Sequence, residues 1–388
     1  MEFELAERMN DFEEGIFQIL DIHKKKMQEK GRKIYNLSVG TPDFKPSKKV
    51  MEAVSKAALD PENYKYSLCD RDVLTDALKQ KYKQRYGVEL ADQEMMTVYG
   101  SQEGIAHIAL ALCDPGDQIL VPDPGYPIFS IGPKLAGVEA ITYELLPENN
   151  YLPDLDLIAD GLSNRVKAMI VSYPLNPIGK AAPLEFYEKL VSWAMEHKIL
   201  IIHDNAYSDI IFDGRKGISI LSIFRAKECC VEFYSLSKSF NVTGARIAFL
   251  VGNAQVVTAF KKVRSQIDYG MFLPIQYGAA VALMEDESLV KEQCRIYEER
   301  RNVLCGGLRQ IGWNVEDSEG SMFVWAKLPG TYQNSLDFVL ELIEKAGVIC
   351  TPGDVFGSLG YGHVRFALTL PAEQLKEAVS QIERSGIL

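Results

Sequence analysis

The sequence predicts an α/β protein built around a mostly parallel sheet. Between residues 98 and 251, short apolar runs alternate with amphipathic helical stretches, the pattern of strands joined by crossover helices. After Glu285 the pattern changes to a long charged helix, followed by short strands with helices between them. Together these observations predict a large domain, with its sheet between helices, and a smaller α+β domain.

The first predicted element is the amphipathic helix Phe17 to Lys30, which ends at Gly31 because glycine readily adopts the left-handed conformation that terminates helices. The apolar run Ile34 to Val39 follows it. The predicted strands of the large domain are 118–121, 138–143, 168–173, 199–203, 231–234 and 247–251. The predicted helices between and after them are 102–113, 183–197 and 254–266. In the smaller domain we predict strands around 322–327 and 363–368.

These elements place the domain boundaries. We predict a large domain over residues 45–285, and a small domain formed by the N-terminal arm, residues 1–44, together with residues 286–388. A chain of 388 residues with 47% hydrophobic content is long enough for two domains with a sizeable core.

Charge and composition exclude several functions. The chain has 42 basic and 53 acidic residues, a net charge of −11, and no long basic run, so neither nucleic acid nor an anionic membrane is expected as a partner. Residues 1–10 lack the apolar segment of a secretory signal, and no stretch approaches a membrane span, which predicts a cytoplasmic protein. The seven cysteines lack metal-ligand spacing, so no metal site is expected.

Lys238 stands in the run Tyr234 to Arg246, where hydroxyls, a glycine and an arginine surround one lysine just after an apolar strand. A lysine that forms a Schiff base must lose its proton, which a second cation and little water favour. Arg246, Ser235 and Ser237 offer the donors that a nearby phosphate needs. A solvated loop with a surface lysine is the alternative interpretation.

Other polar residues follow further predicted strands, and ligands of open parallel sheets lie beyond the carboxyl ends of strands. Ser101 and Gln102 open a helix whose free N–H groups suit a phosphate, although simple capping also explains them. The rigid turn 122–127 presents Tyr126, whose face suits stacking on a heteroaromatic ring; a packed surface tyrosine is the alternative.

Three more candidate site residues are predicted at the same edge of the sheet. Asp204 follows the buried run 199–203, where a carboxylate can hold a proton on a pyridine nitrogen or, alternatively, cap a helix. Asn176 and Tyr207 can donate to a phenolate oxygen, although Asn-Pro is also a turn signal.

Taken together, these motifs resemble the class I/II aminotransferases of fold type I, which are pyridoxal 5′-phosphate enzymes. The resemblance covers nearly the whole chain and is nearest to the LL-diaminopimelate, aspartate and alanine aminotransferase-like subgroup. It implies a seven-stranded sheet in the large domain. It implies that Lys238 binds the cofactor as a Schiff base and carries the proton between the substrate Cα and the cofactor C4′.

The resemblance also assigns the other roles. The implied phosphate ligands are Ser101, Gln102, Ser235 and Arg246, with Ser237 as an additional one. Tyr126 would stack on the ring, Asp204 would pair with the pyridinium nitrogen, and Asn176 and Tyr207 would donate to the 3′-oxygen. In the C-terminal part, Arg365 would clamp the substrate α-carboxylate, while Gly40 in the loop 38–43 would let the backbone approach it.

Tyr64, or alternatively Tyr66, resembles a tyrosine that reaches the phosphate of the neighbouring subunit, which implies a homodimer with shared active sites. The chain departs from the family pattern near this tyrosine, where Cys69 or Asp70 replaces the usual glycine and Thr75 the usual arginine. It also departs at Ala245, Ala248 and Tyr269, beside the implied cofactor site. These changes remove no implied catalytic group.

The favoured function is a transaminase that moves an amino group from an L-amino acid to a 2-oxo acid, with 2-oxoglutarate the expected acceptor, by a ping-pong mechanism. A carbon-sulfur β-lyase of the same fold is the alternative, because the motifs scarcely separate the two. A third hypothesis, a cofactor-sensing DNA-binding regulator, is disfavoured because the enzyme-like pattern begins almost at residue 1 and the charge is acidic. The run 267–276 most resembles that of the diaminopimelate-type members, which implies a diaminopimelate-type donor.

Overall fold

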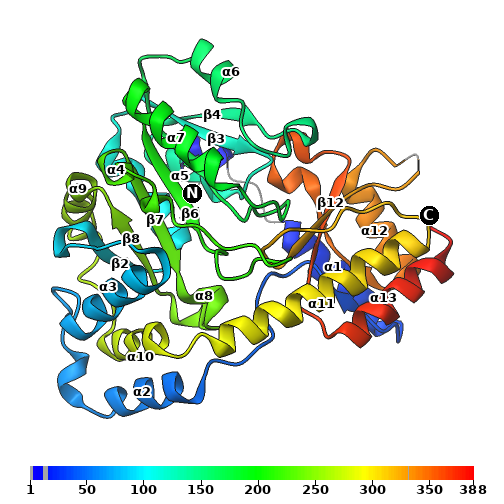
Figure 1. Cartoon of the computed structure of the whole chain (residues 1–388). Helices are drawn as coiled ribbons and strands as arrows, with labels where there is room; N and C mark the ends of the chain where they lie inside the picture. The colour runs from blue at the N-terminus through cyan, green and yellow to red at the C-terminus, as the bar shows by residue number, and fades with distance from the viewer. Residues whose placement is uncertain (1–2, 12–15, 331) are drawn as a thin grey trace. The chain divides into compact units, whose positions relative to one another are not determined.

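The computed structural model describes residues 3–11, 16–330 and 332–388 (Figure 1). The chain divides into two compact units. The larger comprises Thr41–Glu298 and Ser318–Ser321, and the smaller comprises Met1–Gly40, Glu299–Asp317 and Met322–Leu388.

A seven-stranded sheet forms the centre of the larger unit. Its strands are β2 (Met95–Val98), β3 (Gln118–Asp123), β4 (Glu139–Glu144), β5 (Val166–Val171), β6 (Leu200–Asn205), β7 (Cys230–Ser235) and β8 (Ala248–Gly252). They lie in the order β2-β8-β7-β6-β5-β3-β4, and β8 is antiparallel to both of its neighbours. All the other strands run in one direction, so their carboxyl ends share one edge.

The helices of this unit are α2 (Lys48–Ala58), α3 (Asp72–Tyr86), α4 (Ser101–Leu112), α5 (Ile128–Leu135), α6 (Leu155–Asp160), α7 (Leu184–His197), α8 (Leu236–Ser239), α9 (Ala254–Arg264) and α10 (Leu273–Met284). The long helix α11 (Ser288–Gln310) contains residues of both units.

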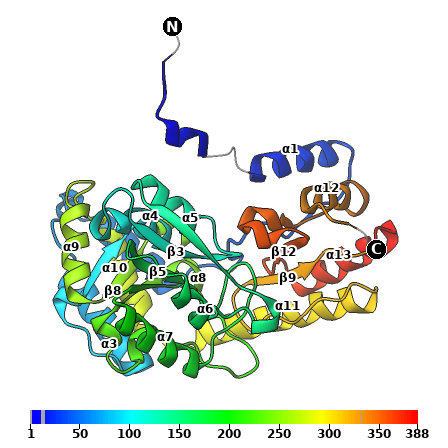
Figure 2. The same cartoon turned by 90° about the horizontal axis from the view of Figure 1, so that it is seen from above.

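Figure 2 shows α3 and α4 on opposite faces of the sheet, and the side chains of β7 agree with this arrangement. A Cβ built on Gly104 of α4 would lie only 2.3 Å from the ring of Phe233, so this ring faces α4. On the other face, Tyr82 of α3 donates to Glu232 at 2.7 Å and packs on Tyr234, with ring centroids 5.7 Å apart. The arrangement follows from the alternation of side chains along a strand.

The smaller unit contains two short sheets. β1 (Tyr35–Asn36) pairs in parallel with β10 (Val348–Ile349), while β11 (Thr351–Pro352), β12 (His363–Ala367) and β9 (Phe323–Lys327) form an antiparallel sheet in that order. Its helices include α1 (Ile16–Glu29), α12 (Ser335–Ala346) and α13 (Ala372–Ser385). The ring of Trp313 lies between those of Phe338 and Phe366, at centroid distances of 5.4 and 5.5 Å.

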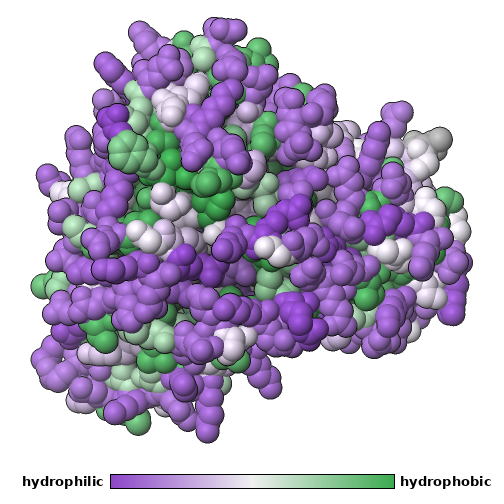
Figure 3. All heavy atoms as spheres, in the orientation of Figure 1, coloured by the Kyte–Doolittle hydropathy of each residue, from purple (hydrophilic) through white to green (hydrophobic). Residues whose placement is uncertain are grey.

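The predicted fold class is confirmed, and the six strands predicted individually in the large domain are present with ends shifted by one or two residues. β2 escaped individual prediction because only four residues, Met95–Val98, form it. No helix within the described ranges is long and apolar enough to cross a bilayer. Hydrophilic side chains predominate on the face shown in Figure 3.

The contact between α4 and β7 yields a stability prediction. Gly104→Ala should lower the free energy of unfolding by about 1–3 kcal/mol, because the added methyl group overlaps the ring of Phe233 in a packed core. Gly306→Ala is the matched control: this glycine also lies within a helix, α11, but no atom approaches its Cβ position within 4 Å. The control should gain about 0.5–1 kcal/mol from helix propensity. Urea unfolding of both variants tests this, and equal effects would contradict the packing argument.

Candidate active site

The predicted cofactor residues of the larger unit gather at one edge of its sheet. Six strands that run in the same direction end there, five of them followed by predicted residues, and the antiparallel strand β8 begins there. The residues are Ser101 and Gln102 after β2, Tyr126 after β3, Asn176 after β5, Asp204 and Tyr207 at the end of β6, Ser235, Ser237 and Lys238 at the end of β7, and Arg246 before β8. Most of these side chains are buried or half-buried, and Gln102 and Arg246 are exposed.

Asp204 faces the start of α4 because its neighbour His203 faces the opposite layer. Nδ1 of His203 lies 2.9 Å from the Oε2 atom of Glu232, a carboxylate that also accepts from Tyr82 of α3. Alternation along β6 therefore directs Asp204 toward α4, where the hydroxyl of Ser101 donates to its carboxylate. Asp204 is only 6% exposed, and within the described part of the chain its Oδ1 has no hydrogen-bond partner.

Burial raises the pKa of Asp204 to about 6, although His203, the hydrogen bond from Ser101 and the charge of Lys238 each act in the opposite direction. A buried carboxylate with an unpartnered oxygen is costly unless a donor or cation meets it. The protonated nitrogen of a heteroaromatic ring would supply both.

The start of α4 and the side chain of Arg246 lie side by side in an arrangement that suits an anion. Gly100 precedes the helix with a φ of 85°, and a Cβ there would lie 2.5 Å from Nη2 of Arg246. The same guanidinium donates to the carbonyl oxygens of Tyr99 at 3.3 Å and Thr243 at 3.0 Å. The free N–H groups of the first helical turn carry partial positive charge, which repels a guanidinium. An anion beside both groups removes this repulsion, so the arrangement suits a phosphate.

Lys238 lies half-buried in the short helix α8. Ser235 caps this helix, because its Oγ accepts from the N–H of Ser237 at 3.2 Å. After β3, the hydroxyl of Tyr126 donates to Oε1 of Gln102 at 2.9 Å. The structure thus brings the cation, the capping hydroxyls and the aromatic ring to the edge that Asp204 occupies.

The two tyrosines considered for a role at a neighbouring subunit, Tyr64 and Tyr66, lie on the surface of the larger unit. Tyr64 is 64% exposed, donates to the carbonyl of Ala58 at 2.9 Å and packs against the ring of Phe272. Tyr66 is 80% exposed and packs against the ring of Tyr269, with centroids 5.1 Å apart. Neither contact involves the residues gathered at the sheet edge.

In the smaller unit, Arg365 on β12 is buried between two aromatic rings. Its Cζ lies 4.0 Å from the centroid of Phe323 and 4.7 Å from that of Phe356. Nη2 donates to the carbonyl of Ser38 at 2.9 Å. A Cβ on Gly40 would lie 2.5 Å from Phe323, so only glycine fits against this ring. The fixed planar guanidinium suits a carboxylate, which binds such a group by two parallel hydrogen bonds.

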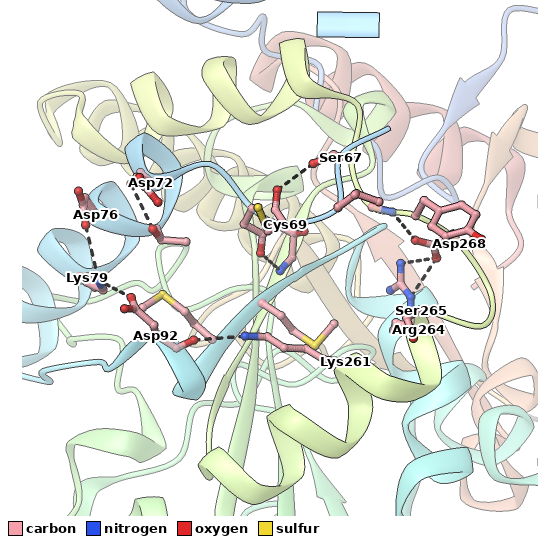
Figure 4. A pocket seen from close by; sticks show the side chains of 18 residues that line it. Ser67, Cys69, Asp72, Asp76, Lys79, Asp92, Lys261, Arg264, Ser265 and Asp268 are labelled. Carbon is pink, nitrogen blue, oxygen red and sulfur yellow. Dashed lines mark hydrogen bonds and ion pairs between the residues drawn. The ribbon is translucent and has the colours of Figure 1, made fainter. Parts of the chain in front are cut away.

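A separate cavity of about 780 Å³ lies elsewhere in the larger unit (Figure 4). None of the predicted cofactor residues lines it. Its charged groups are largely paired with each other, as Lys79 is with Asp92 and Arg264 with Asp268, each pair at 2.6 Å. We therefore take the sheet edge, and not this cavity, as the candidate site.

Comparisons with known proteins identify the family of the chain. The family model described as aminotransferase class I and II matches residues 32–382. The chain belongs to this family. It is 40% identical over 383 residues to an LL-diaminopimelate aminotransferase from Aquifex aeolicus, a match that covers 98% of this chain and 99% of the relative.

Two solved structures of this aminotransferase fold are also similar. BacF from Bacillus subtilis is 35% identical with a TM-score of 0.94, over 99% of this chain and 98% of BacF. A probable N-succinyldiaminopimelate aminotransferase from Thermus thermophilus is 32% identical with a TM-score of 0.90, over 96% of this chain and all of the other. The predicted transaminase class is confirmed, and the β-lyase alternative is not favoured.

Several residues of the candidate site carried no usable sequence signal. Phe323 and Phe356 hold Arg365 from two different segments, and Thr351 Oγ1 lies 3.3 Å from its Nη2. Aromatic residues near a strand are usually core residues. The pairing of β11, β12 and β9 brings Thr351 and Phe323 to the arginine, and Phe356 comes from the short helix Gly353–Phe356 that follows β11. Within the described residues, no group of three or more His, Cys, Asp or Glu side chains is arranged to hold a metal ion.

The raised pKa of Asp204 predicts that Asp204→Asn stabilises the cofactor-free protein at pH 7. The folded pKa of about 6 exceeds the ordinary value of 3.8, so the folded state holds this proton more tightly than the unfolded state does. The resulting loss of folding free energy is absent below pH 3.8, grows as the pH rises from 3.8 to about 6, and is complete above that pH. At about 1.4 kcal/mol per pKa unit, asparagine should gain up to roughly 3 kcal/mol at pH 7.

Urea unfolding of the cofactor-free protein at pH 5 and pH 7 measures this gain. Asp160→Asn, an exposed position at the end of α6, serves as the control and should change stability little at either pH. A gain that does not increase between pH 5 and pH 7 would contradict the assignment.

Proposed function

We propose that this aminotransferase binds pyridoxal 5′-phosphate at the sheet edge and transfers the amino group of LL-diaminopimelate to 2-oxoglutarate in a ping-pong cycle. The observation that carries the proposal is the meeting of a buried, unpartnered carboxylate oxygen with the start of α4 and with Lys238. When bound, the cofactor supplies an electron sink for the electron pair left at the substrate Cα.

Different residues at the sheet edge bind different parts of the cofactor. The N–H groups of α4, with Ser101, Ser235 and Arg246, bind the phosphate, and Gln102 and Ser237 complete this donor set. Tyr126 stacks on the ring, while Asp204 keeps the ring nitrogen protonated by stabilising its positive charge. Asn176 and Tyr207 donate to the 3′-oxygen. Their burial at adjacent strand ends supports this orienting role.

Proton transfer is assigned to Lys238. Its amine nitrogen removes the proton from the substrate Cα and delivers it to the cofactor C4′. The charge of Lys238 acts to lower the pKa of Asp204, so the amine and this carboxylate lie within electrostatic reach of each other. We assign the substrate α-carboxylate to Arg365, with the backbone of Gly40 beside it, because Arg365 is buried and held flat between two rings.

The proposed amino donor is inferred from the similar proteins. Several curated relatives at 36–40% identity over almost the full chain are named LL-diaminopimelate aminotransferase. The likeness to BacF, at 35% identity, keeps other donors in the test panel. A cytoplasmic location, which the acidic charge and ordinary composition support, is part of the same proposal.

We also propose that the chain works as a homodimer in which Tyr64 reaches the partner's phosphate. Tyr64, Tyr66, Leu68 and Tyr269 are each at least 60% exposed. Exposed apolar and aromatic side chains gathered in this way are typical of protein interfaces.

A single-turnover experiment tests the donor. The purified protein with its cofactor is mixed separately with LL-diaminopimelate, aspartate, alanine, glutamate and cystathionine while its absorbance spectrum is recorded. We expect LL-diaminopimelate to convert the cofactor fastest to a stable pyridoxamine form, which 2-oxoglutarate reverses. Lys238→Ala should abolish multiple turnover, because no other amine is assigned to the proton transfer. Pyruvate accumulating from cystathionine, with an unchanged cofactor spectrum, would support the lyase instead.

The dimer proposal predicts a mass in solution of twice 43.4 kDa, which light scattering measures. Tyr64→Phe should weaken cofactor binding by about tenfold or more, because a hydrogen bond to a charged group contributes on the order of 1.5–3 kcal/mol. Tyr66→Phe is the matched control and should bind the cofactor as the unchanged protein does. A weaker affinity in Tyr66→Phe alone would transfer the role to Tyr66, and a monomer would overturn the proposal.

A further inference from the structure

The backbone around Lys238 depends on outside support. Helix α8 contains only four residues, Leu236–Ser239, and its one C-terminal backbone bond runs from the N–H of Phe240 to the carbonyl of Leu236. Short helices are unstable alone, and the carbonyl groups of their last turn lack helical partners. The carbonyl of Lys238 is one of these groups, so its orientation depends on another element.

Gln293 on α11 supplies that support. Its Nε2 donates to the carbonyl of Lys238 at 2.8 Å, and its Oε1 accepts from Nδ2 of Asn241 at 2.8 Å. Gln293 is 5% exposed, so water competes little with either bond. One side chain thus holds both ends of the segment 238–241.

The orientation of this amide is fixed by its partners. A backbone carbonyl only accepts hydrogen bonds, so the atom of Gln293 that faces Lys238 must be the nitrogen. Its oxygen must then face Asn241, which adopts a left-handed backbone conformation with a φ of 58°. Glutamine is the uncharged side chain of this length with a donor and an acceptor on one group.

Close packing alone does not fix this segment, because a cavity of about 370 Å³ borders it. The cavity is lined by Asn241, Gln293, Phe240 and Ser239 among other residues. Side chains therefore leave space on this side of the lysine segment, and the two hydrogen bonds provide the directional restraint.

We propose that Gln293 is a positioning residue for the transamination reaction. It fixes the backbone of Lys238 so that the amine nitrogen reaches both proton-transfer positions, and Asn241 orients Gln293. The inference rests on the proposed function, in which Lys238 moves the proton. Misplacement of a reacting group by about 1 Å reduces rates by about a hundredfold.

The test compares three variants of the full-length protein loaded with pyridoxal 5′-phosphate. Gln293→Leu removes both hydrogen bonds at similar size. Gln293→Glu keeps the acceptor but, when ionised, turns a carboxylate oxygen toward the Lys238 carbonyl. Gln310→Glu makes the same substitution at the exposed end of the same helix and serves as the control. The readouts are the donor half-reaction rate against pH, the cofactor dissociation constant and the folded fraction by circular dichroism.

We expect Gln293→Leu to slow the half-reaction by about tenfold to a hundredfold at every pH, with cofactor affinity changed less than about threefold. Gln293→Glu should be equally slow at high pH and recover at least about fivefold toward the unchanged protein as the pH falls. The protonated carboxyl group again donates to Lys238 and accepts from Asn241, and burial raises its pKa into the accessible range. Gln310→Glu should track the unchanged protein at all pH values.

The inference is overturned if both Gln293 variants react within about twofold of the unchanged protein, or if Gln293→Glu and Gln293→Leu show the same pH dependence. If the Gln293 variants do not fold, Asn241→Ala replaces them, and an unchanged rate in that folded variant overturns the inference. Failure of the proposed function is distinguishable, because the unchanged protein would then show neither a cofactor absorbance band nor a half-reaction.

Discussion

The site depends on one geometric constraint, the shared edge of a sheet in which every strand but β8 runs in the same direction. Each parallel strand delivers its next residues to this edge, and the reversed strand β8 contributes the residue before it. Polar groups distant in the sequence therefore meet at one edge. The same direction of the strands explains why α4, which follows β2, begins at this edge with its positive end toward the site.

The alternation of side chains along the strands places the candidate site residues and a stabilising hydrogen-bond network on opposite faces of the sheet. In β6, His203 faces Glu232 and the α3 layer, where a buried network of hydrogen bonds joins α3 to the sheet. The next residue, Asp204, faces α4 and retains an oxygen without a protein partner among the described residues. The polar groups on one side of β6 are hydrogen-bonded within the protein, and the carboxylate on the other side is arranged for a ligand. Such a buried carboxylate costs folding free energy, which is a common feature of sites prepared for binding.

Two glycines show how closely α4 must approach its neighbours. Gly104 lets the helix pack against Phe233, and Gly100 lets the backbone approach the guanidinium of Arg246. These two close contacts, at Gly100 and Gly104, fix the position of the first turn of α4. By contrast, the four-residue helix that carries Lys238 has little stability of its own, and a side chain of α11 completes its hydrogen bonding. The closely packed helix α4 suits binding of a phosphate, and the short helix α8 carries Lys238.

The sequence by itself determined the alternation of strands and helices, and with it the fold class, because hydrophobic periodicity follows directly from the geometry of each element. It also singled out Asp204, Lys238 and Arg246, since charged residues next to buried strands are conspicuous. Periodicity did not identify Gln293, Asn241, Phe323 or Phe356. Their contacts join segments far apart in the chain, and their residue types are ordinary for a helix, a turn or a core. Only the tertiary structure decided which carbonyl Gln293 meets and which rings enclose Arg365, because such pairings depend on the packing of whole elements and not on local pattern.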